Sequence, residues 1–185
     1  MKLKKFMFKN VNSTNDAAIR IIKKTKIESG IIISDQQKKG KGQYGKKWIS
    51  LKGNLFVSIF FSLKGINISL KNMTKINCYL IKKLIALYYK KKITIKPPND
   101  LLINKKKICG ILQETISKAN SKYIIVGVGL NLIKSPSVQK YPTTNILEIT
   151  KKKLTNKIVA TKLKKIYENY IPKFDKINFK LTNKI

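Results

Sequence analysis

The chain has 185 residues, which is enough for one domain with a sizeable core. Hydrophobic residues make up 43% and charged residues 26%, a balance that excludes a disordered polyelectrolyte. No apolar stretch approaches the roughly 18 to 20 residues of a membrane-spanning helix, and the basic start lacks the apolar stretch of a signal peptide. We therefore expect a cytoplasmic protein with no membrane partner.

The residue types that are missing exclude several kinds of site. The chain has no histidine, so catalytic triads and any mechanism that moves a proton through an imidazole are excluded. The two cysteines, Cys78 and Cys109, form no CxxC motif. We therefore expect neither structural zinc nor a disulfide framework.

The formal net charge of +33 would by itself suggest a nucleic acid or another anionic partner. However, Arg20 is the only arginine, and proteins that read bases usually use the planar fork of arginine. The lysines also lie in short runs along the whole chain. We interpret the charge as a solvated, lysine-rich surface that results from compositional bias and still attracts ATP and acidic proteins. A basic nucleic-acid-binding protein remains an alternative.

The first third of the chain alternates between a helix and strands. Ser13 and Asp16 indicate a capped start for a helix over residues 14–24. A short apolar run predicts a buried strand at 31–34, and the Gly- and Lys-rich residues 35–47 predict a loop. Leu55, Val57, Ile59 and Phe61 alternate with Phe56, Ser58, Phe60 and Ser62, and this period of two residues predicts a strand over residues 55–62.

The remaining elements suggest an antiparallel or mixed sheet. Apolar residues at three- and four-residue spacing predict a helix over residues 71–90. Short runs rich in β-branched residues then predict closely spaced strands at 93–96, 101–103, 108–115 and 123–128. A final helix is expected near residues 153–170.

The loop over residues 40–47 matches two phosphate-binding patterns in its residues but not in its predicted structural context. It can be written as G-x-G-x-x-G or as an incomplete P-loop, but no helix follows to receive a phosphate. Its three glycines still let the backbone approach a ligand closely, and its three lysines add positive charge. An exposed flexible turn is the alternative.

Residues 96–114 can bring a carboxylate and an ammonium together. If Asn104 and Lys105 form a two-residue hairpin turn, Asp100 and Lys107 share one face, one diagonal apart at roughly 7 to 8 Å. A three-residue loop would shift the register and separate them. The alternative is an ordinary surface ion pair of little energetic consequence.

Gly127 and Gly129 occupy alternate positions in the segment over residues 126–132, at the end of the last predicted strand, and remove side chains from one face of it. The resulting slot could receive a flat ligand. Close approach of another backbone is the alternative.

Together these segments resemble the catalytic domain of biotin protein ligases, also called biotin-[acetyl-CoA carboxylase] ligases. The matching strings occur in the order of the family and cover most of residues 10–150: STN at 13–15, QxxGKG at 37–42, GKKW at 45–48, GNLFVSIFF at 53–61, KPPNDL at 96–101, KICGILQE at 107–114, GVGLNL at 127–132 and YPTTNI at 141–146.

The resemblance implies an α+β fold like that of biotin/lipoate ligases and class II synthetases, with a mixed, mainly antiparallel sheet and helices packed on one face. It implies that biotin and ATP react to give biotinyl-5′-adenylate, with Mg²⁺ as cofactor, and that biotin passes to a lysine of the biotin carboxyl carrier protein of acetyl-CoA carboxylase. The carboxylate of biotin is already ionised near pH 7 and needs no base to become a nucleophile, so a histidine-free chain can perform the first step. A lipoate or octanoate ligase or transferase of similar fold is the nearest alternative.

The resemblance also assigns site residues. It implies that Lys107 and Lys41 are catalytic and that Asp100 holds the metal. The biotin-binding residues implied are Ser13, Thr14, Asn15, Gln37, Gly40, Lys41, Gly42, Gln43, Lys107, Gly110, Gly127 and Gly129. The ATP-binding residues implied are Lys41, Lys46, Asn99, Asp100 and Asn131.

The sequence departs from the family pattern in ways that carry expectations. Lys41 and Lys46 stand where the family has arginine, so we expect a leakier adenylate, and Pro97 replaces a tryptophan. We expect a catalytic domain over residues 1–171 and a vestigial or truncated segment over 172–185, with no room for a winged-helix DNA-binding domain and no specific DNA partner. A monomer or weak homodimer is expected.

Overall fold

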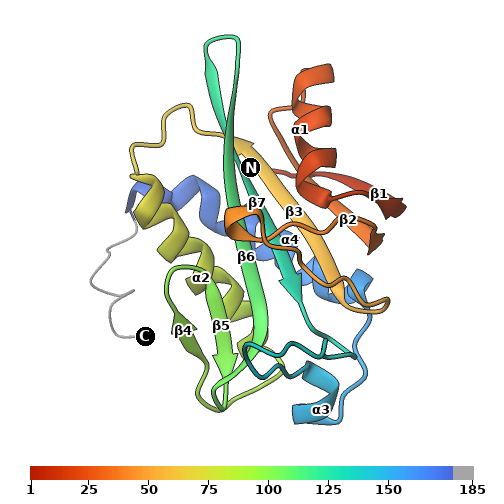
Figure 1. The fold of residues 1–185 in the computed structure, drawn as a ribbon. Helices are drawn as coiled ribbons and strands as arrows, with labels where there is room; N and C mark the ends of the chain where they lie inside the picture. The colour runs from red at the N-terminus through yellow and green to blue at the C-terminus, as the bar shows by residue number, and fades with distance from the viewer. Residues whose placement is uncertain (177–185) are drawn as a thin grey trace.

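The computed structural model describes residues 1–176 as one seven-stranded sheet with helices against it (Figure 1). The strand order is β1-β2-β3-β7-β6-β5-β4. Only β1 and β2 pair in parallel, and all other neighbours are antiparallel, which confirms the predicted mixed, mainly antiparallel sheet. The strands are β1 (Lys4–Val11), β2 (Ser29–Gln37), β3 (Leu55–Ser62), β4 (Thr94–Lys96), β5 (Asp100–Ile103), β6 (Lys106–Lys118) and β7 (Ser121–Leu130).

The helices lie on both faces of the sheet, so the prediction of one helical face holds only in part. Helices α2 (Leu70–Ala86) and α4 (Asn156–Tyr170) share a large apolar core with one face, and α4 runs behind the strands in Figure 1. Helix α1 (Thr14–Lys24) packs on the opposite face in a second, smaller core. This helix forms the crossover connection that the parallel neighbours β1 and β2 require.

Most predicted elements are present at nearly the predicted positions. Helix α1 has the predicted bounds, and the Oγ of Ser13 caps it by accepting a hydrogen bond from the Asn15 amide at 3.2 Å. The predicted strand at 31–34 is the middle of the longer β2, and the predicted loop contains a 3₁₀ turn at Gln43–Gly45. Among the strands and α-helices, two were not predicted, namely β1 and the short helix α3 (Ile146–Thr150).

The hairpin between β5 and β6 forms as predicted. Asn104 and Lys105 have φ values of 49° and 63°, which a two-residue type I′ turn requires. Leu102 lies opposite Lys107, but the register shifts between Leu101 and Leu102. Asp100 therefore lies opposite Gly110, and the irregularity still leaves Asp100 and Lys107 in contact.

The core continues beyond residue 171, where the predicted catalytic domain ends. Residues Ile171–Lys176 form a 3₁₀ turn, and Phe174 is buried with its ring centre 5.8 Å from that of Phe61. The rest of the predicted C-terminal segment, residues 177–185, lies outside the described residues.

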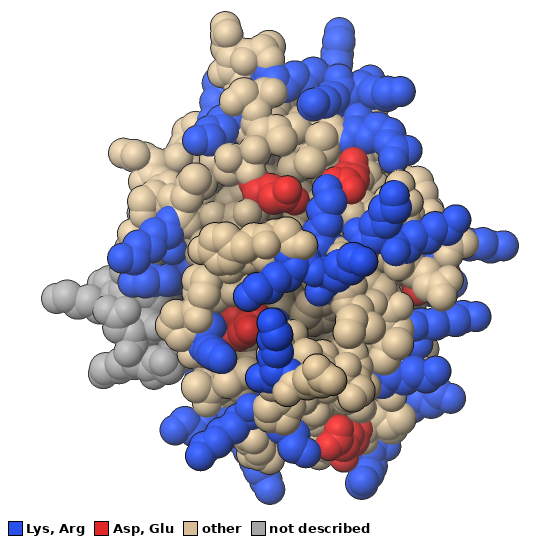
Figure 2. Space-filling view, viewed as in Figure 1, with Lys and Arg blue, Asp and Glu red and all other residues tan. Residues whose placement is uncertain are grey.

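No helix within residues 1–176 is long and apolar enough to cross a membrane. Figure 2 shows basic side chains spread around the visible face, with a few acidic side chains among them and uncharged areas between them.

Candidate functional site

A cavity of about 310 Å³ lies between the start of α1, the loop over residues 41–48, and strands β6 and β7. Asp100, Lys107 and residues of the glycine-rich loop all line it. Of the residues assigned from sequence, those that line it are Ser13, Thr14, Asn15, Gln37, Lys41, Gly42, Gln43, Lys46, Asn99, Asp100, Lys107, Gly110, Gly127 and Gly129.

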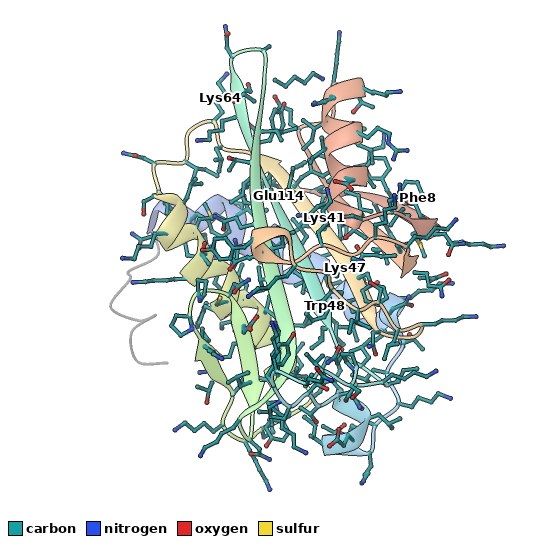
Figure 3. All side chains as sticks on the ribbon, in the orientation of Figure 1. Phe8, Lys41, Lys47, Trp48, Lys64 and Glu114 are labelled. Carbon is teal, nitrogen blue, oxygen red and sulfur yellow. The ribbon has the colours of Figure 1, made fainter. Side chains whose placement is uncertain are left out.

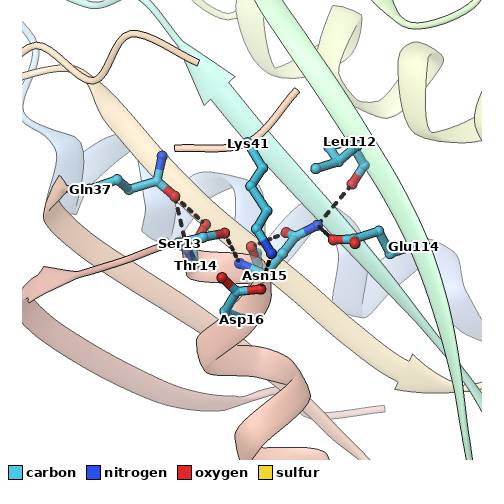
Figure 4. Close-up of polar contacts among 9 residues, drawn as sticks. Ser13, Thr14, Asn15, Asp16, Gln37, Lys41, Leu112 and Glu114 are labelled. Atoms are coloured by element: carbon cyan, nitrogen blue, oxygen red, sulfur yellow. Dashed lines mark hydrogen bonds and ion pairs between the residues drawn. The ribbon is translucent and has the colours of Figure 1, made fainter. Parts of the chain in front are cut away.

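One end of the cavity is polar and is organised around Asn15 (Figure 4). The Oδ1 of Asn15 accepts a hydrogen bond from Ser58 Oγ at 2.5 Å, and its Nδ2 donates to Glu114 Oε2 at 2.5 Å. Asn15 is 2% exposed, and Ser58 is fully buried. These partners on β3 and β6 fix the orientation of the amide before any ligand binds.

Gln37 holds the neighbouring part of the same end. Its Oε1 accepts hydrogen bonds from the Thr14 amide at 2.8 Å and from Thr14 Oγ1 at 3.0 Å, while its Nε2 donates to Ser50 Oγ at 3.1 Å. Gln37 lies at the end of β2 and Thr14 at the start of α1. The wall therefore presents amide and hydroxyl groups in fixed positions.

The glycine-rich loop folds back on itself above the cavity. The amide of Trp48 donates to Gly40 O at 2.9 Å, and that of Gly42 to Lys46 O at 2.7 Å. A side chain at Gly40 would place its Cβ 2.5 Å from the Trp48 carbonyl oxygen, so this position requires glycine. Gly40 thus shapes the loop and does not line the cavity.

Lys41 reaches from this loop to the first turn of α1 (Figures 3 and 4). Its Nζ lies 2.5 Å from Asp16 Oδ1, and both side chains are partly exposed to solvent. The contact brings a positive charge over the polar end of the cavity and ties the loop to the helix.

The slot predicted at the alternating glycines exists, but side chains of the protein itself fill it. Gly110 and Gly129 are register partners, and a Cβ built on them would lie 2.8 Å and 2.4 Å from the Trp48 ring. A Cβ on Gly127 would lie 2.4 Å from Asn15 Oδ1. The Nε1 of Trp48 is buried and has no hydrogen-bond partner among the described residues.

Lys107 and Asp100 form the charged end of the cavity. Lys107 Nζ lies 2.8 Å from Asp100 Oδ1, and the two side chains are only 15% and 23% exposed. The pair is therefore partly buried, unlike the fully solvated ion pair that was the alternative. Lys107 Nζ also lies 5.5 Å from the Trp48 ring centre, within the range of a cation–π contact.

The cysteines beneath this end are not nucleophiles. Burial, assisted by the charge of Asp100, raises the pKa of the Cys78 thiol to about 12. Burial also raises the pKa of the Cys109 thiol. Both remain protonated near pH 7, which excludes a thiolate mechanism.

The side chains of the cavity fit a metal ion only if a bound nucleotide supplies the other ligands. Residues 1–176 contain no group of three His, Cys, Asp or Glu side chains that could hold a metal. Asp100 supplies one carboxylate, and Mg²⁺ in nucleotide sites is usually held by one or two carboxylates together with phosphate oxygens.

Asn131 is not part of the cavity wall. It is 1% exposed, its Nδ2 donates to Thr144 O at 3.1 Å, and its Oδ1 accepts from Asn54 Nδ2 at 3.4 Å. These contacts tie the end of β7 to the segment before α3.

Sequence reasoning gave no role to Trp48, Tyr141 or Ser58, although the first two line the cavity and the third holds Asn15. Trp48 is the only tryptophan and follows the loop directly, which was the available signal. Ser58 interrupts a run of large apolar residues in β3.

Comparisons with known proteins agree with this fold. Residues 7–131 match the model of the biotin/lipoate A/B protein ligase family. The bifunctional ligase/repressor BirA of Escherichia coli (strain K12) is 28% identical over 124 residues, which are 66% of this chain and 38% of that protein. The biotin-[acetyl-CoA-carboxylase] ligase of Paracoccus denitrificans is 26% identical over 133 residues, 70% of this chain and 55% of that protein.

The chain therefore spans about 38% to 55% of the length of these two curated relatives. Among solved structures, the biotin protein ligase from Aquifex aeolicus in complex with biotin and ATP is similar, with a TM-score of 0.80 and 27% identity. The match covers 95% of this chain and 73% of that chain.

Proposed function

The chain belongs to the biotin/lipoate A/B protein ligase family, and we propose that it activates biotin with ATP as biotinyl-5′-adenylate and transfers biotin to a lysine of the biotin carboxyl carrier protein of acetyl-CoA carboxylase. The names of the relatives and the biotin and ATP bound to the Aquifex structure support this substrate choice. A cytoplasmic location is part of the same proposal.

The observation that carries the proposal is a single cavity with two chemically different ends. One end presents the amides and hydroxyls around Asn15 and Gln37, and the other presents the Lys107 ammonium. A substrate with a hydrogen-bonding ring and a carboxylate tail fits such a cavity. Biotin has both, with a ureido ring that donates and accepts hydrogen bonds.

The fixed amides also favour biotin over lipoate. The dithiolane ring of lipoate has no N–H or C=O group to pair with Thr14, Asn15 or Gln37. These side chains already have partners within the protein, so the preference comes from the additional hydrogen bonds that the ureido ring of biotin can make with them and lipoate cannot.

The first step needs charge stabilisation and no base. The ionised carboxylate of biotin attacks the α-phosphorus of ATP, a C–O–P anhydride forms, and pyrophosphate leaves. In our proposal, Lys107 stabilises the charge that develops on the transferring phosphate, and Lys41 and Lys46 add positive potential from the loop. Asp100 contacts Lys107 and would hold Mg²⁺ together with the nucleotide, and Asn99 would contact the nucleotide. The ion would neutralise phosphate charge when bound.

The second step requires a neutral amine on the acceptor. A free lysine with a pKa near 10.4 is neutral only about once in a few thousand at pH 7. The positive potential of the loop lysines and Lys107 favours the neutral form of an incoming amine. That amine attacks the activated carbonyl, AMP leaves, and the amine loses its proton as the amide forms.

Exchange of labelled pyrophosphate into ATP tests the first step. We expect exchange that depends on biotin, and none when lipoate replaces biotin. Exchange with lipoate alone would identify a lipoate ligase. Exchange with neither acid would contradict an adenylating function, and a basic nucleic-acid-binding protein would be the remaining alternative.

A further inference from the structure

The ammonium of Lys107 contacts two aromatic rings and a carboxylate. Its Nζ lies 5.1 Å from the ring centre of Tyr141 and 5.5 Å from that of Trp48, and it contacts Asp100 at 2.8 Å. Its side chain is 15% exposed, while that of its neighbour Lys106 is 48% exposed and contacts Glu148 at 3.6 Å. Only Lys107 of these two neighbours has aromatic rings against its ammonium.

The segment that carries Tyr141 also holds the backbone of Lys107. The Lys107 amide donates to Pro142 O at 2.9 Å, and the Thr144 amide donates to Lys107 O at 3.0 Å. A parallel bridge joins Lys107 to Thr143. The segment lies outside residues 7–131, which match the family model.

We propose that Tyr141 is a positioning residue for Lys107, because its ring and that of Trp48 hold the ammonium beside Asp100. The inference rests on the proposed function only for its kinetic consequence. Lysine has four rotatable bonds, so an unrestrained ammonium would spend little time where the carboxylate and phosphate react. The π faces attract the charge without forming hydrogen bonds and leave its N–H groups free for the substrate.

Tyr141 carries this role by its ring and not by its hydroxyl. Tyr141→Phe keeps the ring, whereas Tyr141→Leu and Tyr141→Gln remove it and still leave a side chain of several heavy atoms at this position. Tyr141 is 38% exposed and lies in a connecting segment, so its replacement does not threaten the core.

The chain offers a matched control in another lysine that contacts tyrosine rings. Lys83 Nζ lies 5.3 Å from the ring centre of Tyr79 and 5.5 Å from that of Tyr170, between α2 and α4. Tyr79→Leu removes a comparable contact away from the cavity, and we expect it to leave pyrophosphate exchange unchanged.

The test combines two measurements. In the substrate-free protein, the labelling rate of Lys107 by a small amine-reactive reagent is followed by peptide mass spectrometry. We expect Tyr141→Leu and Tyr141→Gln to raise it about tenfold and to lower kcat for biotin-dependent exchange about tenfold, with KM for biotin changing less than twofold. Tyr141→Phe is expected to match the wild type in both measurements.

Unchanged kcat in both non-aromatic variants would overturn the proposal, and so would a Tyr141→Phe variant as impaired as Tyr141→Leu. If the wild type shows no exchange with biotin, the proposed function fails. The ratio of the Lys107 labelling rates in the variants and the wild type then still decides whether the Tyr141 ring covers the Lys107 ammonium, because labelling needs no substrate.

Discussion

The two faces of the sheet are built from the same strands and differ most along β7. On the face toward α2 and α4, β7 presents an unbroken apolar series to the large core: Ile124, Val126, Val128 and Leu130. On the opposite face, Ile125 packs under α1, but the next two positions are Gly127 and Gly129. The two glycines make room there for Asn15 and Trp48, which form part of the cavity wall.

The neighbouring strands show the same difference. In β3, Ser58 lies on the cavity face between the large residues Phe56 and Phe60, and in β6 Gly110 lies opposite Gly129. A site can therefore be opened by small residues on one face while the other face keeps a continuous core. That core supports the strands on which the binding groups stand.

The largest expected effect is loss of the charge at the cavity. Lys107→Ala should lower pyrophosphate exchange by at least about a hundredfold, because it removes the cation beside the reacting phosphate. Thermal unfolding should change little, since the side chain contributes no apolar core. Lys162→Ala, an equal loss of charge on the exposed side of α4, is the control. Near-normal exchange in Lys107→Ala would remove Lys107 from the mechanism.

A second variant adds a methyl group to the cavity face. Gly127→Ala should raise KM for biotin about tenfold, because the new Cβ would lie 2.4 Å from Asn15 Oδ1 and displace that amide. In an Asn15→Ala background the same substitution should cost much less, since the obstructed group is gone. Equal effects in both backgrounds, measured by steady-state kinetics, would show that Gly127 acts without Asn15.

The opposite face predicts a change in stability without a change in chemistry. Leu84→Ala should lower the free energy of unfolding by about 2 to 5 kcal/mol, because Leu84 is fully buried in the large core. Activity per folded molecule should persist. Urea denaturation measures the first quantity, and Leu87→Ala, at a position 49% exposed, is expected to cost under about 0.5 kcal/mol. A change in KM for biotin in Leu84→Ala would contradict the separation of the two faces.

The smallest expected effect concerns the loop. Lys41→Arg should slow release of biotinyl-adenylate about threefold, because a guanidinium can bind Asp16 or a phosphate through two N–H groups. Release is measured by trapping the free adenylate. Lys39→Arg, in the same loop and outside the cavity wall, should leave release unchanged. Faster release in Lys41→Arg would count against the leaky-adenylate expectation.

The sequence by itself determined the features that depend on near neighbours. Ser13 capping of α1, alternation in β3, and the turn at Asn104 and Lys105 are local, and the turn sets the pairing of Leu102 with Lys107. The register shift that follows, which the sequence did not predict, also determines how Asp100 meets Lys107. The order of the resembling motifs also identified most residues of the cavity wall. The strand β1 was missed because its lysines, which suit an exposed sheet edge, hide the alternation of a half-buried strand.

Only the tertiary structure decided which side chains fill the glycine slot and which hold the functional groups. The contact of Asn15 with Glu114 spans 99 residues, and that of Lys107 with Tyr141 joins a strand to a distant connecting segment. The crossover role of α1 likewise depends on the parallel pairing of β1 with β2, and its face is seen only in the packed core. Periodicity and turn chemistry report on residues a few positions apart, whereas these contacts exist only after the strands have paired and the helices have packed.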